Sequence, residues 1–227
     1  MSYSPRLLES AVEFIDNPEP RCACVLLLDT SGSMEGPKIQ ALNQGLQIFK
    51  DELQRNKLAS LRVEVAVVTF DSQVLVSRDF VTADQFDPPV LATGGVTHMA
   101  AGIEKALDLV EARKAAYDAN GILRYRPWIF MITDGEPQGE PEAAVTRAAQ
   151  KVKAAEQANK VTFYAVGVEG ANMAKLANMA VRTPLSLKGL KFADLFVWLS
   201  RSMEGISNVK PGEMVVLPPA DGWGTAG

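Results

Sequence analysis

Basic segments and long apolar runs are missing from this chain, and we expect no secretory leader. Its 227 residues carry 23 Lys and Arg against 27 Asp and Glu, a formal net charge of −4 with no basic block. We therefore expect neither nucleic acid nor a membrane surface as a partner. No run is long enough to span a bilayer, and residues 1–20 mix charged with apolar residues. These absences predict a cytoplasmic protein.

Cysteine, histidine and the common catalytic motifs are scarce as well. Cys22 and Cys24 are expected to be reduced and buried. The single histidine, His98, stands beside a predicted helix start, where a structural role is more common than ligation or catalysis. The chain contains no Gly-x-Ser-x-Gly elbow and no Walker loop, and no Gly-x-Gly-x-x-Gly turn follows a predicted strand. Hydrolases, NTPases and dinucleotide enzymes thus lack their required parts, and we expect a protein that is not an enzyme.

Strand-like and amphipathic helical segments alternate along the chain. The predicted strands are 22–28, 61–70, 74–80, 128–133, 161–168 and 184–187, and the main predicted helices are 37–56, 100–117, 141–158, 172–180 and 192–206. The short link between the second and third strands requires an antiparallel hairpin. This order predicts an α/β fold: a three-layer sandwich with a doubly wound, mostly parallel sheet of six strands, one antiparallel edge strand and helices on both faces.

The same pattern divides the chain into one main domain and two short flanks. Apolar residues at helical spacing from 4 to 15 predict an N-terminal helical extension over 1–20, ended by a Pro-rich breaker. The α/β domain is expected over 21–207, and a Pro- and Gly-rich C-terminal tail over 208–227. With 47% hydrophobic residues, the chain can bury a full core.

Oxygen-bearing side chains follow two of the buried strands. Asp29, Ser31 and Ser33 follow the first strand at a spacing of two, and Asp134 follows the strand at 128–133. If these strands are neighbours where the strand order reverses, their carboxyl ends face one crevice. Thr97, from a glycine-hinged loop, can reach the same place. Carboxylates and hydroxyls are hard ligands that suit Mg²⁺, with Mn²⁺ and Ca²⁺ as alternatives.

Other interpretations of these residues remain open at this point. Ser31 or Ser33 alone can cap the following helix by accepting hydrogen bonds from its free N–H groups. Thr93 is an alternative to Thr97 in the glycine-hinged loop. A metal-assisted phosphatase with Asp29 as nucleophile is a third. Such an enzyme also needs a second acid and a lysine near the nucleophile, whereas Lys38 is expected on the next helix.

The Asp-x-Ser-x-Ser sequence at residues 29–33, followed by Thr97 and Asp134, resembles the metal-ion-dependent adhesion site of von Willebrand factor type A (VWA) domains. The resemblance covers about residues 20–206. It implies that the three hydroxyls bind the metal directly or through water, and that the two carboxylates bind it or hold its waters. It also implies that a protein partner supplies an acidic side chain to complete the coordination.

Within that family the chain is similar to the stand-alone bacterial TerY-like type found in tellurium-resistance gene clusters. The likeness is carried by residues 29–34, 43–46, 133–137 and 196–200 and by the Pro-Pro-Ala-Asp-Gly-Trp tail. It implies a role in stress response, tellurite resistance or phage defence, beside a kinase and a phosphatase partner. The alternative within the same family is a regulatory subunit of an AAA+ ATPase complex.

Overall fold

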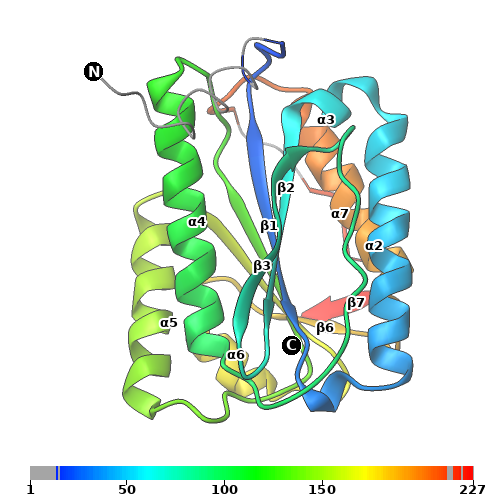
Figure 1. The fold of residues 1–227 in the computed structure, drawn as a ribbon, viewed down its shortest axis with the longest axis vertical. Helices are drawn as coiled ribbons and strands as arrows, with labels where there is room; N and C mark the ends of the chain where they lie inside the picture. Colours follow the sequence, from blue (N-terminus) through cyan, green and yellow to red (C-terminus); the bar gives the residue numbers. More distant parts are fainter. Residues whose placement is uncertain (1–13, 15, 214–216, 221, 227) are drawn as a thin grey trace.

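The computed structural model describes residues 14, 16–213, 217–220 and 222–226, so the helix predicted over 4–15 lies almost wholly outside the described residues. The elements are shown in Figure 1 and run in chain order as follows. They are β1 (Cys22–Asp29), η1 (Gly32–Met34), α2 (Pro37–Arg55), α3 (Lys57–Arg62), β2 (Val63–Phe70), β3 (Val74–Thr82), α4 (Met99–Ala119), β4 (Trp128–Thr133), α5 (Glu142–Gln157), β5 (Thr162–Gly167), α6 (Met173–Met179), β6 (Leu185–Leu187), α7 (Phe192–Ser207) and β7 (Gly224–Ala226).

The strands form one sheet in the order β3-β2-β1-β4-β5-β6-β7. Strands β2, β1, β4, β5 and β6 are parallel to one another. Strand β3 joins β2 in the antiparallel hairpin that their short link requires. The predicted α/β sandwich is confirmed, but six strands was one too few. The seventh, β7, lies in the segment predicted as a tail and pairs antiparallel with β6, so both edges of the sheet are antiparallel.

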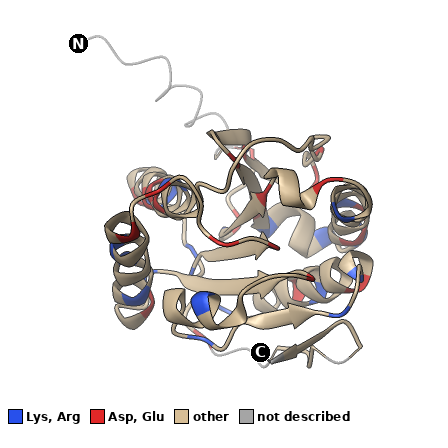
Figure 2. Cartoon of the chain, turned by 90° about the horizontal axis from the view of Figure 1, so that it is seen from below, with Lys and Arg blue, Asp and Glu red and all other residues tan. Residues whose placement is uncertain are grey.

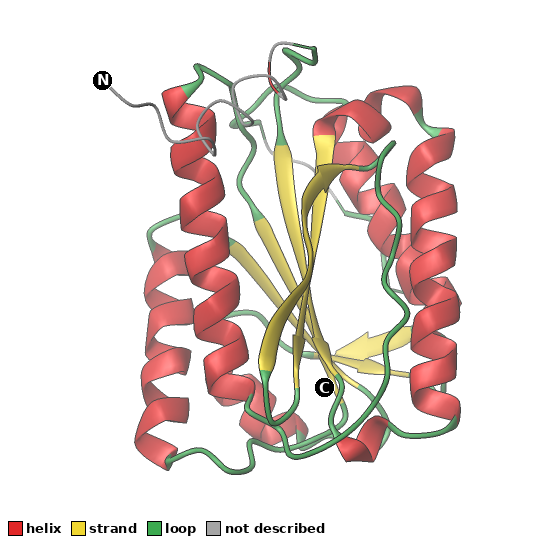
Figure 3. Cartoon of the chain, viewed as in Figure 1, coloured by secondary structure: helices red, strands yellow, loops and turns green. Residues whose placement is uncertain are grey.

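Helices cover both faces of the sheet, as Figures 1 and 3 show. On one face α2 and α7 pack against alternate residues of β1, among them Cys24, Leu26 and Leu28. On the other face α4 packs against the intervening residues, among them Val25 and Leu27, and α5 and α6 extend the same cluster over β5. Every residue of β1 is buried, as expected for a strand with no face in water. Of the helices in the described residues, none combines the length and hydropathy that a membrane span requires.

A capping residue and a close helix contact shape α2 and its neighbours. The helix predicted over 37–56 instead ends at Arg55, because the Asn56 side chain accepts hydrogen bonds from Leu58 N and Ala59 N (3.0 and 2.9 Å) and starts α3. Midway along α2, a Cβ on Gly45 would lie 2.5 Å from the Phe196 ring. Glycine at this position therefore lets α2 and α7 approach closely.

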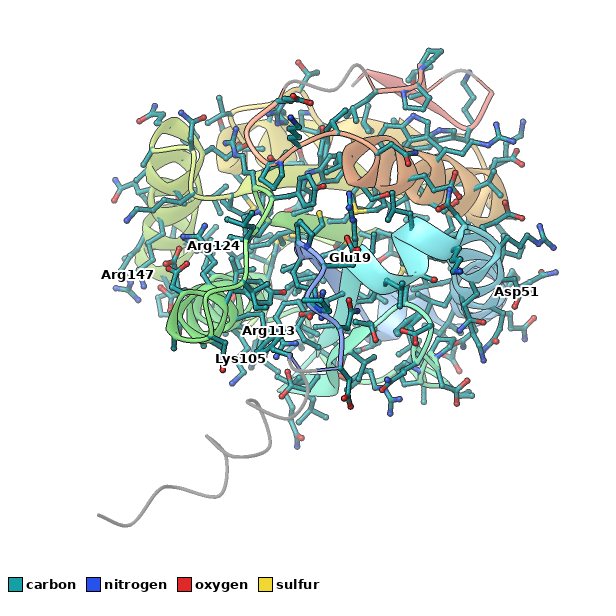
Figure 4. The ribbon with its side chains drawn as sticks, turned by 90° about the horizontal axis from the view of Figure 1, so that it is seen from above. Glu19, Asp51, Lys105, Arg113, Arg124 and Arg147 are labelled. Atoms are coloured by element: carbon teal, nitrogen blue, oxygen red, sulfur yellow. The ribbon has the colours of Figure 1, made fainter. Side chains whose placement is uncertain are left out.

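The amino-terminal ends of the central strands hold a buried ionic cluster. Arg21 Nε lies 2.9 Å from Glu64 Oε1, and both side chains are 0% exposed. Glu64 Oε2 accepts further hydrogen bonds from Arg113 Nε (2.6 Å) and from the Tyr117 hydroxyl. Figure 4 views the molecule from this end and labels Arg113. The two guanidinium groups thus balance a carboxylate that has no access to water.

Both cysteines are free and buried, as predicted. Burial raises the pKa of the Cys22 thiol from 9.0 to about 12, with a smaller contribution from the charge of Glu64. Burial also raises the pKa of the Cys24 thiol. Such thiols stay protonated and serve as core packing rather than as nucleophiles or ligands.

Candidate metal centre

The site is built where the strand order reverses. Strands β1 and β4 are parallel neighbours, with Leu28 in register with Ile132, so their carboxyl ends open at one edge of the sheet. Asp29 is the last residue of β1, and Asp134 directly follows β4. Both carboxylates are buried, with 0% and 4% of each residue exposed. The predicted juxtaposition of the two strand ends is therefore present.

The loop after β1 turns its hydroxyl groups toward β4. Ser31 N donates to Asp29 Oδ1 (2.8 Å), which bends the chain directly after the strand. The hydroxyl oxygens of Ser31 and Ser33 lie 3.0 Å apart, and Ser33 Oγ donates to Asp134 Oδ1 (2.6 Å). A chain of oxygen atoms thus links the two loops.

These bonds also decide the helix-cap alternative. Ser31 precedes the short helix η1, and its side chain makes no capping hydrogen bond. The residue that caps α2 is Gly36, which has no side chain to offer. The serine hydroxyls are engaged with each other and with Asp134 instead, so the helix-cap interpretation is wrong.

Thr97 reaches the site from the glycine-hinged loop. That loop is tied to the β1 loop by hydrogen bonds from Gly32 N to the Gly95 carbonyl (3.1 Å) and from Gly94 N to the Thr30 carbonyl (2.9 Å). Thr97 itself is 2% exposed. A Cβ on Gly135 would lie 3.2 Å from Thr97 Oγ1.

A Cβ on Gly135 would also lie 3.5 Å from Asp29 Oδ2, so Thr97 and Asp29 both lie beside this glycine. Thr93 is half-buried, and no hydrogen bond found among the described residues joins it to Asp29, Ser31 or Asp134. The geometry thus favours Thr97 over Thr93 as the residue of this loop that faces the site.

Two neighbours of the carboxylates were not predicted. Thr133 donates its hydroxyl hydrogen to Asp29 Oδ2 and accepts from Gly135 N (3.1 Å), so it holds the Asp29 carboxylate in place. Lys38, the second residue of α2, forms an ion pair with Asp134 Oδ2. Its ammonium group also lies 3.4 Å from the Ser33 carbonyl oxygen. Thr133 ends a buried strand and looks like core in the sequence, and Lys38 resembles any other helical lysine.

Burial is the largest influence on the Asp29 carboxyl. It raises the pKa of the Asp29 carboxyl, and hydrogen bonds from Ser31 and Thr133 oppose this increase. The nearby negative charge of Asp134 raises the pKa further. A cation placed between the two carboxylates would relieve both the burial cost and the mutual repulsion. Figure 2 views the molecule from this end and shows both acidic and basic positions along the surrounding ribbon.

The donor set fits a hard divalent cation. Oxygens bound side by side to Mg²⁺ at 2.0–2.1 Å in an octahedron lie about 2.8–3.0 Å apart. The Ser31–Ser33 hydroxyl separation of 3.0 Å matches this spacing, and the Ser33–Asp134 hydrogen bond, at 2.6 Å, is shorter than it. No cluster of three or more His, Cys, Asp or Glu suited to a metal occurs in the described residues. Asp29 and Asp134 with the three hydroxyls offer oxygen donors only, and oxygen donors suit Mg²⁺.

Comparison with known families gives one match that spans most of the chain. A profile of the von Willebrand factor type A domain matches residues 24–188, a range that contains all five predicted site residues. A search of curated proteins found no significant match.

Solved structures show the same fold at low sequence identity. A von Willebrand factor type A protein from Catenulispora acidiphila is 19% identical with a TM-score of 0.64, over 82% of this chain and 43% of that one. The pilus adhesin SpaC from Lactobacillus rhamnosus GG is 14% identical with a TM-score of 0.65, over 82% and 31%. The ArnB paralog VWA2 from Sulfolobus acidocaldarius is 17% identical with a TM-score of 0.55, over 81% and 45%. In each case this chain spans less than half of the matched protein.

Proposed function

This chain belongs to the von Willebrand factor type A domain family, and we propose that it acts as a metal-dependent protein-interaction module without catalytic activity. The family consists of protein-interaction and adhesion modules. The proposed ligands of the metal, directly or through water, are Asp29, Ser31, Ser33, Thr97 and Asp134. Mg²⁺ is the proposed ion, with Mn²⁺ and Ca²⁺ as alternatives.

The convergence of three loops at the carboxyl ends of β1 and β4 carries this proposal. The serines of the β1 loop contact each other and Asp134, and Thr97 faces Asp29 across Gly135. Two carboxylates balance the charge of a divalent ion, and neutral hydroxyls add little to it. Mg²⁺ also retains water molecules that a stronger oxygen ligand can displace. A carboxylate is a stronger oxygen ligand than water, so a partner protein's carboxylate is the incoming ligand that we propose.

The finer assignment is a TerY-like role in stress response, tellurite resistance or phage defence. It rests on the sequence resemblance of residues 29–34, 133–137 and 196–200 to that type. On this proposal the protein is cytoplasmic, and its partners are a kinase and a phosphatase encoded in the same gene cluster. The alternative partner is an AAA+ ATPase, for which the chain would be a regulatory subunit.

A metal-assisted phosphatase is a second candidate because the structure brings Lys38 to Asp134. The proposed nucleophile of such an enzyme, Asp29, is poorly placed for attack. Its Oδ1 accepts from Ser31 N, its Oδ2 accepts from the Thr133 hydroxyl, and the residue is 0% exposed. We therefore expect no hydrolysis of p-nitrophenyl phosphate in Mg²⁺, and Asp134-dependent turnover would favour the enzyme instead.

Co-purification tests the interaction function. Tagged wild-type protein is expected to retain the kinase or phosphatase in Mg²⁺ and to release it in EDTA, and Asp134→Asn is expected to retain neither. Asp118→Asn is the matched control, because Asp118 is an exposed aspartate that pairs with Arg124 away from the site. Retention of an AAA+ ATPase in place of these partners selects the alternative. Retention that is unaffected by both EDTA and Asp134→Asn contradicts metal-dependent binding.

A further inference from the structure

Lys38 pairs with one of the two carboxylates that are proposed to hold the metal. Its ammonium group pairs with Asp134 Oδ2, while Asp134 Oδ1 accepts from Ser33. The Asp134 side chain is 1% exposed and that of Lys38 is 25% exposed. Within the described part of the chain, no other ion pair involves Asp134 or Asp29. The ammonium group is thus the positive charge that the structure itself supplies to this site.

We propose that Lys38 is a built-in counter-charge that competes with the divalent ion for Asp134. This inference rests on the proposed metal site. A buried carboxylate without a counter-charge is costly, so Lys38 stabilises Asp134 when no metal is bound. A divalent ion at the same carboxylate repels the ammonium group, and Lys38 then moves out to water.

The side chain of Lys38 suits such an exchange. Lysine carries its charge at the end of a flexible four-carbon stem and can hold its head group in water while the stem stays packed. A quarter of the side chain is already exposed, and its contact with the Ser33 carbonyl is long, at 3.4 Å. On moving out, the ammonium group would give up its ion pair with Asp134 and its long hydrogen bond to Ser33. Metal affinity is therefore set by an exchange of cations rather than by filling a bare site.

Calorimetric titration of Mg²⁺ and Mn²⁺ into Lys38→Met tests the competition. Methionine keeps the length of the stem and removes the charge, so we expect about tenfold tighter metal binding than in the wild type. Tenfold corresponds to about 1.4 kcal/mol, the scale of a net hydrogen bond to a charged group. Lys50→Met is the matched control: Lys50 also lies on α2, its side chain is 26% exposed, and it pairs with Asp87. Unchanged or weaker metal binding by Lys38→Met overturns the proposal.

A second measurement separates this inference from the proposed function. In EDTA, Lys38→Met is expected to lower the melting temperature, because Asp134 loses its counter-charge. The loss should be much smaller in an Asp134→Asn background, where no charge needs balancing. Equal decreases in melting temperature in the two backgrounds overturn the role of Lys38 as the counter-charge of Asp134, whatever the result of the metal titration. If neither the wild type nor Lys38→Met binds metal, both the proposed function and the competition fail. A decrease in melting temperature that occurs only where Asp134 is retained would then show that Lys38 is a structural partner of Asp134 and nothing more.

Discussion

Removing the charge of Glu64 is expected to destabilise this protein severely. Arg21 is fully buried beside it at 2.9 Å, and Arg113 contacts the other carboxylate oxygen at 2.6 Å. Glu64→Gln keeps the volume of the side chain but leaves Arg21 as a buried cation without its carboxylate. Breaking a buried pair in this way costs about 3–5 kcal/mol. In a chain of this size, each kcal/mol lowers the melting temperature by about 2–4 °C, so a decrease of about 6–20 °C is expected.

Urea denaturation followed by circular dichroism measures this loss directly. Glu104→Gln is the control, because Glu104 forms a surface pair with Lys151 whose removal should cost below about 1 kcal/mol. Adding Arg21→Met to Glu64→Gln should recover part of the stability, since the second change removes the unpaired cation. A loss below about 1 kcal/mol for Glu64→Gln, or additive losses in the double variant, would refute the claim that Glu64 balances a buried charge.

Three further changes test the packing, the thiols and the site. Gly45→Ala is expected to lower the free energy of unfolding by about 1–3 kcal/mol, because its Cβ would meet the Phe196 ring at 2.5 Å; urea denaturation showing equal or higher stability contradicts this. Burial raises the pKa of Cys22 to about 12, so the folded state binds this proton more tightly than the unfolded state. The contribution of this thiol to the free energy of unfolding is complete below pH 9 and is lost as the pH rises toward 12. Rapid thiol labelling of the folded protein at pH 8 would contradict the burial that raises this pKa. Gly135→Ala should weaken metal binding by about tenfold in calorimetry, because its Cβ would crowd Thr97 at 3.2 Å, and unchanged affinity opposes that role for Thr97.

The strands were predictable where a strand is long and buried on both faces. β1 and β4 are continuous apolar runs that end at polar loops, so both their existence and their end points could be predicted. β7 was missed because three residues carry no periodic pattern, and only pairing with β6 defines them as a strand. The short helix α3 was missed, because the predicted helix ended at 56 and the next strand was predicted from 61, whereas the Asn56 side chain caps a further helix over Lys57–Arg62.

The candidate site was predictable as a set of loop residues but not as a network of contacts. Asp29 and Asp134 each follow a buried strand, and the rule for parallel sheets brings such residues to one edge. Thr133 was not identified because a threonine at the end of a buried strand looks like core, although its hydroxyl holds Asp29. The pairing of Lys38 with Asp134 depends on how α2 is oriented at the sheet edge, which no local sequence pattern specifies.

Calorimetric titration of Mg²⁺ and Mn²⁺ into wild type, Asp29→Asn and Asp134→Asn tests the central claim most directly. Circular dichroism establishes that each variant is folded, and Asp118→Asn, altered at an exposed surface pair, serves as the control. The account predicts one ion per wild-type chain, the same affinity in the control, and loss of binding in both site variants. Unchanged metal binding by folded Asp29→Asn and Asp134→Asn would contradict a shared metal centre at the ends of β1 and β4.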